Sequence, residues 1–374
     1  MQLSISNRST LIGKGFCPGD VATLNGISYE VVDNELLRVR IAQGVDLTRL
    51  CTSLVTDMSA LFFDTKFNQP IHYWDVSNVV DMSRMFAQST FNHPIGNWDT
   101  GKVKSMRSMF QDSCFNQPIE GWNVSEVQDM GYMFFNSFFN QPIGNWNVAK
   151  VKDMSYLFSK SLFNQDIGSW NVGNVRTMIG MFKDVNDRLP FASKNPFNQD
   201  IGAWNVSKVK DMSYLFFNSI FNKDISAWQV STVRTFKRMF KNSLFNQPLG
   251  SWNLEKAEDL EELFCNSRYN QDLSSWRVQH RAKPLNFDSN CPNWILPKPS
   301  WATTDSDWVH GFIWGAQSIV FEPISTFYSA SWRVLFLFLS LTLPTFFPIC
   351  YMVITYEDIF FAPKNNILNQ NLKI

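Results

Sequence analysis

The fold of this chain is decided by stretches such as FNQPIGNWNVAKVKDMSYLF, residues 139–158. With its phenylalanine as position 1, the pattern restarts every 24 residues, apart from one step of 34 residues. The starts are Phe67, Phe91, Phe115, Phe139, Phe163, Phe197, Phe221, Phe245 and Tyr269. The long step places a ten-residue insertion within residues 183–196, and residues 43–66 fit as a degenerate first unit. A fixed period of this length predicts a repeat architecture.

Apolar residues recur at fixed positions of the unit. Position 5 is Ile or Leu, position 8 is Trp in all nine complete units, and position 10 is nearly always Val. Apolar positions 8 and 10 around a polar position 9 have the period of a short strand. Positions 13, 16, 19 and 20 favour a short helical segment on the same core, because they are spaced by three and four. The aspartates at position 15 suit the N-cap of that segment. They include Asp81, Asp129, Asp153 and Asp211.

One unit cannot bury its Trp, Met and Phe side chains alone, so successive units must stack. The sequence predicts a β-solenoid over residues 43–280, built from about ten coils with a parallel sheet and short helical segments. Neighbouring strands would lie ~4.8 Å apart. The asparagine at position 2 predicts a ladder of hydrogen bonds between coils, because its side chain both donates and accepts.

The unit resembles the repeat of the BspA-like bacterial surface proteins, a leucine-rich-repeat-like family. The residues that carry the resemblance are FNQPIGNWDTGKVKSMRSMF (91–110) and residues 139–158, and it extends over about residues 43–280. The lead-in 19–59 and the segment 281–301 also look like the flanks of such proteins. The resemblance implies a β-solenoid of the leucine-rich-repeat type, displayed at the cell surface and used for adhesion or other protein binding.

The flanks of the repeats carry local signals of their own. Residues 1–42 form an expected lead-in and cap, in which residues 21–24 and 27–32 surround an Asn-Gly pair typical of a hairpin turn. Residues 34–42 are expected to form a helix that shields the first coil. Residues 281–301 would close the opposite end of the array.

The C-terminal region differs in composition. Residues 302–333 are expected to be a linker and residues 357–374 a polar tail. Between them, residues 334–356 run for 23 residues without a charge, long enough to cross a ~30 Å hydrocarbon layer as a helix. We expect a transmembrane helix there; the alternatives are an apolar tail docked on the domain, or one translated past the natural end. Residues 1–20 show no secretory signal, so either the protein is not exported by that route or Met1 is not the natural start.

Composition and motifs argue against an enzyme. The chain has 33 basic and 33 acidic residues, so no global field favours nucleic acid as a partner. Its six cysteines form no CxxC pair, and no HExxH motif, glycine-rich phosphate loop or GxSxG elbow occurs. The position-15 aspartates come at most once per unit, which favours capping over a calcium ladder. We expect no catalytic residue, metal or cofactor, and a protein or a glycan as the partner.

Three surface features are candidates for recognition. The polar residue at position 9 is expected on the strand face opposite the core, as in Asp75, Asp99, Asn123, Asn147, Asn171 and Asn205. A basic stripe at positions 12 and 14 would attract an acidic partner, and it includes Lys150, Lys152, Lys208 and Lys210. The insertion carries the apolar pair Leu189 and Phe191, which suits a contact loop. The simpler alternatives are a solvated edge and a tolerated surface insertion.

The sequence thus predicts a non-enzymatic binding or adhesion module at a membrane or cell surface. A tail-anchored intracellular scaffold for protein interactions is the second hypothesis, and a glycan-acting enzyme is a distant third. An enzyme would need convergent carboxylates outside the repeat register, and the sequence shows no such cluster.

Overall fold

The computed structural model describes residues 1–6, 10–184, 194–278 and 283–301. These residues belong to the first of two compact units, Met1–Trp308. The expected linker, transmembrane helix and polar tail (302–374) lie outside the described residues, as do Leu189 and Phe191. None of the helices in the described part of the chain has the length and apolarity needed to cross a membrane.

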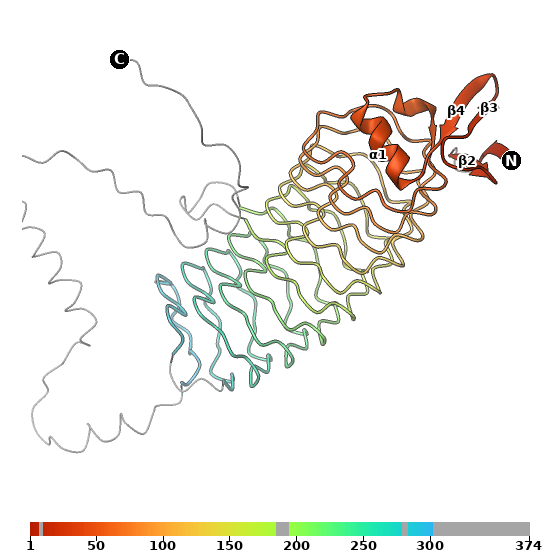
Figure 1. Ribbon diagram of the computed structural model, residues 1–374. Coiled ribbons are helices and arrows are strands. Elements are labelled where there is room, and N and C mark those ends of the chain that lie inside the picture. The colour runs from red at the N-terminus through yellow and green to blue at the C-terminus, as the bar shows by residue number, and fades with distance from the viewer. Residues whose placement is uncertain (7–9, 185–193, 279–282, 302–374) are drawn as a thin grey trace, which may run out of the picture. The chain divides into compact units, whose positions relative to one another are not determined.

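The N-terminal segment forms two small sheets and the helix α1 (Figure 1). Strands β1 (Gln2–Ile5) and β2 (Leu11–Lys14) pair antiparallel, as do β3 (Val21–Leu24) and β4 (Ile27–Val31). The expected hairpin is confirmed, because Asn25 and Gly26 take the positive φ angles of 51° and 78° that its two-residue turn requires. Helix α1 (Asn34–Ala42) matches the expected bounds and is capped by Asp33.

The repeats follow as coils that stack side by side, each joined to the next by backbone hydrogen bonds (Figure 1). A short 3-10 helix, η1 (Leu47–Arg49), leads into β5 (Leu50–Cys51), which pairs in parallel with β4. Beyond β5, successive coils meet at isolated parallel bridges, most of them between residues at position 15. Amides at positions 16, 18, 20 and 22 then donate to carbonyls of the next coil, as from Met82 to Ser105 at 3.0 Å and from Arg84 to Arg107 at 2.8 Å.

The expected helical segment at positions 13–20 is wrong: position 15 lies in a parallel bridge, and positions 16–23 form consecutive turns. The amide of Met85 donates to the carbonyl of Met82 at 3.2 Å, and the next turn is closed in the same way by Ala87 and Arg84 at 3.1 Å. Position 18 has a positive φ, 57° at Arg84, which a type II turn requires at its third residue and which interrupts an α-helix. Alternate amides point to the neighbouring coil, so they cannot form a helical ladder within their own coil.

The expected strand around the Trp of each unit is also largely absent from the described residues. Only β5 in the first coil and the bridge between Leu254 and Val278 carry this pairing. Turns on both sides explain the difference. The amide of Trp74 donates to Ile71, and the amide of Val79 donates to Val76, so the chain between these turns is too short for a regular strand.

The core consists of columns of identical side chains, as the sequence predicts. Every Trp at position 8 is at most 4% exposed. The ring of Trp146 lies 6.4 Å from that of Trp122 and 6.5 Å from that of Trp170, with nearly parallel planes. Its indole nitrogen donates to the carbonyl oxygen of Ile119 in the preceding coil at 3.2 Å, a contact that every other unit reproduces. The column is therefore both packed and hydrogen-bonded.

The expected asparagine ladder is confirmed. The Oδ1 atom of Asn116 accepts from the backbone amide of Asn140 at 2.9 Å, and Asn140 accepts in the same way from Asn164. The same bond joins all neighbouring coils from Asn68 to Asn270. Position 2 is thus occupied by Asn for a structural reason.

The segment that follows the last coil packs against the open end of the array. Trp294 and Phe287 are buried and contact the ring of Phe264 edge-on. The carboxylate of Asp288 pairs with Lys283 and, at 2.6 Å, with Lys298. Burial raises the pKa of Asp288, but the hydrogen bonds and charges of the two lysines outweigh it and leave the pKa lowered. These contacts tie the closing segment together.

Candidate binding surface

The position-9 residues form one column on the surface of the stack. Asn123, Asn147, Asn171 and Asn205 are exposed, and Asp99 is half-buried. The expectation fails at Asp75, which is only 4% exposed. The hydroxyl of Ser53 in the first coil donates to the Asp75 carboxylate at 2.8 Å, and strand β2 lies against the same place, where the amide of Leu11 donates to the carbonyl of Tyr73 at 2.7 Å. The column is therefore accessible only beyond the first coils.

Each position-9 side chain also has a local structural role. The Oδ1 atom of Asn147 accepts from the amide of Ala149 at 3.2 Å, and Asn205 accepts from Ser207 at 3.1 Å. Asp99 makes the same bond to Gly101. Aspartate and asparagine share this acceptor, so the change from acid to amide along the column leaves the turn intact. The Nδ2 groups of the amides remain as further donors.

The basic stripe is continuous at position 14. The amide of Arg176 donates to the carbonyl of Lys152 at 2.9 Å, Lys210 donates to Arg176 at 2.8 Å, and Arg234 donates to Lys210 at 2.9 Å. These bonds place the four residues on neighbouring coils, whose backbones lie ~4.8 Å apart. All four residues are exposed. The structure therefore brings Lys152 and Lys210 together through Arg176.

The partners of the stripe differ along its length. The Lys150 ammonium pairs with Glu126 at 2.6 Å, and Arg234 pairs with Glu258. Lys152 instead donates to the neutral side chain of Gln128 at 2.9 Å, and Lys208 donates to that of Asn174 at 2.6 Å. Carboxylates thus neutralise the ends of the stripe more than its middle. Exposed pairs of this kind contribute little to stability, ~0–1 kcal/mol each.

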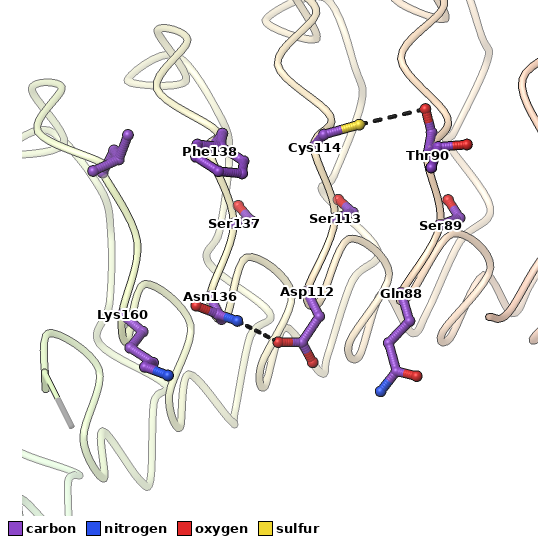
Figure 2. A pocket seen from close by; sticks show the side chains of 11 residues that line it. Gln88, Ser89, Thr90, Asp112, Ser113, Cys114, Asn136, Ser137, Phe138 and Lys160 are labelled. Carbon is purple, nitrogen blue, oxygen red and sulfur yellow. Dashed lines mark hydrogen bonds between the residues drawn. The ribbon is translucent and has the colours of Figure 1, made fainter. Parts of the chain in front are cut away.

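A shallow groove along positions 22–24 was not predicted from the sequence (Figure 2). Its wall is an apolar row with Cys114, Phe138 and Leu162, of which Phe138 is 61% and Leu162 is 55% exposed. The opposite wall is polar, and there Asn136 donates to Asp112 at 2.6 Å. The signal in the sequence is position 24, which changes from polar to apolar between units although no core contact demands it.

The insertion leaves the stack at the same edge. It lies between Asp184 at position 22 and Asn195, which takes position 23 and forms a parallel bridge with Ser219. Asn195 also donates to the carbonyl of Phe158 at 2.9 Å, which holds the returning chain on the preceding coil. The 24-residue register therefore resumes at Asn195.

The position-15 aspartates act as caps of turns rather than of helices. Asp153 accepts from the amide of Ser155 at 2.7 Å, and Asp129 from that of Gly131 at 2.8 Å. Arg107 lies between the two carboxylates, 3.4 Å from Asp129 and 3.0 Å from Asp153. Burial raises the pKa of Asp129, and the guanidinium of Arg107 opposes the shift. Within the described residues, no group of three or more His, Cys, Asp or Glu side chains could hold a metal ion.

Comparison with known proteins identifies a repeat family. The family model described as a Mycoplasma protein of unknown function, DUF285, matches residues 37–138, 114–188 and 188–292. A search of curated proteins and a search of solved structures found no match. The three tandem matches agree with the repeat period and span more than half of the chain. The chain therefore belongs to the DUF285 family of repeat proteins.

Proposed function

We propose that the chain is a non-enzymatic binding or adhesion module, displayed at the cell surface, that recognises protein or glycan partners through its stacked coils. One observation carries the proposal: the residues common to all units face the core or bond neighbouring coils, whereas the variable positions 12, 14 and 24 lie on continuous outer surfaces. Stacked repeats provide extended binding surfaces of this kind.

We further propose that the array is a β-solenoid of the leucine-rich-repeat type, related to the BspA-like proteins. The parallel bridges at position 15 and the 24-residue step of the side-chain ladders support this fold class. The consecutive turns at positions 16–23 take the place of the helix that we expected from the sequence. An experimental structure that shows non-adjacent coils in contact would contradict it.

Membrane attachment through residues 334–356 is part of the proposal. The support is their length without a charge. In cells that express the full chain, we expect it to sediment with membranes, to resist carbonate extraction, and to be cleaved by protease added outside intact cells. Carbonate-resistant protein that stays protected from outside protease would favour the tail-anchored scaffold, and extractable protein would contradict the membrane helix.

The binding function has its own test. Purified full chain, coated on a surface, should bind host cells or matrix components in a saturable way, and free chain should compete. The Lys152→Ala and Asn147→Ala variants test the outer faces without changing the core, because neither side chain packs in the interior. Absence of saturable binding to cells, matrix proteins and glycans would contradict the adhesion hypothesis. Turnover of a glycan substrate would favour the enzyme hypothesis instead.

A further inference from the structure

Six basic residues gather on one edge of four consecutive coils. In the coils that start at Phe139, Phe163, Phe197 and Phe221, positions 12 and 14 carry six cations and no carboxylate. We call these residues the basic run: Lys150, Lys152, Arg176, Lys208, Lys210 and Arg234. Glutamates stand at both borders, where Glu126 pairs with Lys150 and Glu258 pairs with Arg234. The run is thus a bounded patch within a chain of zero net charge.

The interior of the basic run is held in place by the backbone but not neutralised by an ion pair in the described structure. The amide-to-carbonyl bonds of position 14 fix Lys152, Arg176 and Lys210 on successive coils. The carboxylate of Asp153 pairs with Arg107 at 3.0 Å, and that of Asp211 accepts from the amide of Ser213 at 2.8 Å. Neighbouring coils lie only ~4.8 Å apart, so the exposed cations of the basic run are close to one another. They produce a local positive potential that attracts anions.

The basic run has a period of two coils. Its segments read KVKD (150–153), NVRT (174–177), KVKD (208–211) and TVRT (232–235). Position 14 is basic in every coil, whereas position 12 is basic in alternate coils. The pattern therefore repeats after two coil steps, ~10 Å. A linear polymer with acidic groups in a two-monomer repeat would match this spacing.

A column of amides lies beside the basic run. Asn205 Nδ2 lies 3.5 Å from the point that a Cβ atom would occupy at Gly173, so the side chain sits over position 11 of the preceding coil. The neighbouring position 12, Asn174, receives the Lys208 hydrogen bond. Amide donors and ammonium groups thus share one surface. Sugars present both hydroxyl and acidic groups, and such a mixed surface can bind both.

We propose that the basic run and the adjoining amides bind an extended acidic glycan with a two-sugar repeat, lying along the stack. The inference rests on the binding function proposed above and names its ligand class. Positions 9–15 of the four coils contain no aromatic residue, and single-stranded nucleic acids rely on aromatic stacking. The valines at positions 10 and 13 are buried, and the half-buried Ala149 is small, so the surface offers no large apolar anchor for insertion into a lipid layer.

The test uses the full chain on immobilised heparin, a sulfated polymer with a two-sugar repeat. We expect binding that weakens as salt is raised, because exposed charges are screened. The triple variant Lys152→Gln, Arg176→Gln, Lys210→Gln should bind about tenfold more weakly, since it loses three exposed ionic contacts. The matched control is Lys102→Gln, Lys104→Gln, Lys256→Gln, which removes the same charge from positions 12 and 14 of coils outside the basic run. The control should retain binding within about twofold.

Other outcomes would overturn the proposal. No heparin binding by the full chain excludes the acidic glycan, and it leaves adhesion to protein ligands open to its own assay. Equal losses in the two triple variants would mean that total charge, not the basic run, governs binding. Stronger, variant-sensitive binding to a single-stranded DNA oligonucleotide or to vesicles with anionic lipid would assign the surface to nucleic acid or to a membrane. Thermal melting of both variants checks that the stack is intact.

Discussion

Replacement of Trp146 by alanine tests whether the Trp column stabilises the array. The side chain is only 4% exposed, and truncation of a buried Trp costs ~3–5 kcal/mol through the cavity that remains. Two further losses follow from its contacts. The Ile119 carbonyl loses its indole donor, and stacking with Trp122 and Trp170 is removed on both sides. The Ile119 carbonyl keeps the backbone amide of Trp122 as a donor at 3.1 Å, so the lost indole bond adds only ~0.5–1.5 kcal/mol, and the total should lie in the upper part of the range, about 4–5 kcal/mol.

Three further variants should lower the free energy of unfolding by smaller amounts. Trp146→Phe keeps most of the ring volume but loses the donor to Ile119, so its cost should be intermediate, ~1–3 kcal/mol. Asn147→Ala removes only the cap of the Ala149 amide and should cost ~0.5–1.5 kcal/mol. Lys152→Ala changes an exposed side chain and should stay within ~0.5 kcal/mol.

The assay is equilibrium unfolding in denaturant, followed by both circular dichroism and Trp fluorescence. Coincident transitions are required before one free energy of unfolding is assigned, because repeat arrays lose cooperativity when one coil is weakened. The order of costs is the critical result. If Trp146→Ala costs no more than Lys152→Ala, the indole does not lie in the core and the assignment of inner and outer faces is wrong.

Three other variants test separate features of the stack. Gly180→Ala should cost ~1–2 kcal/mol because Gly180 has a φ of 55° and a Cβ would meet a tyrosine ring at 2.6 Å, whereas Gly121→Ala, with 3.5 Å of space, should be nearly neutral in thermal melts. Asn140→Ala should cost ~1–3 kcal/mol because it leaves the next amide of the ladder without an acceptor, and an unchanged midpoint would refute the ladder's role. The lowered pKa of Asp288 gives stability that is present above its unfolded pKa of ~3.9 and is lost as pH falls through the folded value. Asp288→Asn should therefore melt lower than wild type at pH 7, with a difference that shrinks toward pH 3.

The sequence predicted the inside of the array well. Residues such as Trp146 occupy the same buried place in every coil, so the same residue type recurs at that position of each 24-residue unit. The asparagine ladder was predictable for the same reason, since one side-chain bond repeats between Asn116, Asn140 and Asn164. The hairpin before the repeats was predicted from its Asn-Gly turn, a local signal that needs no tertiary context.

The path of the backbone was predicted less well. Spacings of three and four, as at Met82, Met85 and Phe86, occur in a helix and equally in consecutive turns whose alternate amides bond the next coil. The distinguishing signal is position 22, where positive φ recurs. Position 22 carries Asp112, Asn136 and other Asn residues, which adopt that conformation more readily than most side chains.

Recognition surfaces were predicted only in part, because they depend on which coils are neighbours and on what covers them. Asp75 is buried where Ser53 of the first coil and strand β2 of the N-terminal segment meet it, and the repeat pattern carries no signal for that contact. The groove beside Phe138 arises from residues at position 24 of several coils, and none of them is unusual alone. The basic run was visible as lysines at positions 12 and 14, but its borders became apparent only from the pairs with Glu126 and Glu258.

The architecture separates stability from recognition at the level of single positions. Within one coil, Trp146 and Asn140 are fixed by bonds to the coils before and after, so a change there disturbs three coils at once. Lys150 and Lys152 make only exposed side-chain contacts, and the backbone bonds beneath them do not depend on the side chain. Substitution at positions 12 and 14 therefore alters the surface charge at little cost in folding. An acidic polymer bound along the stack would give the two-coil charge pattern at these positions a role that stability does not.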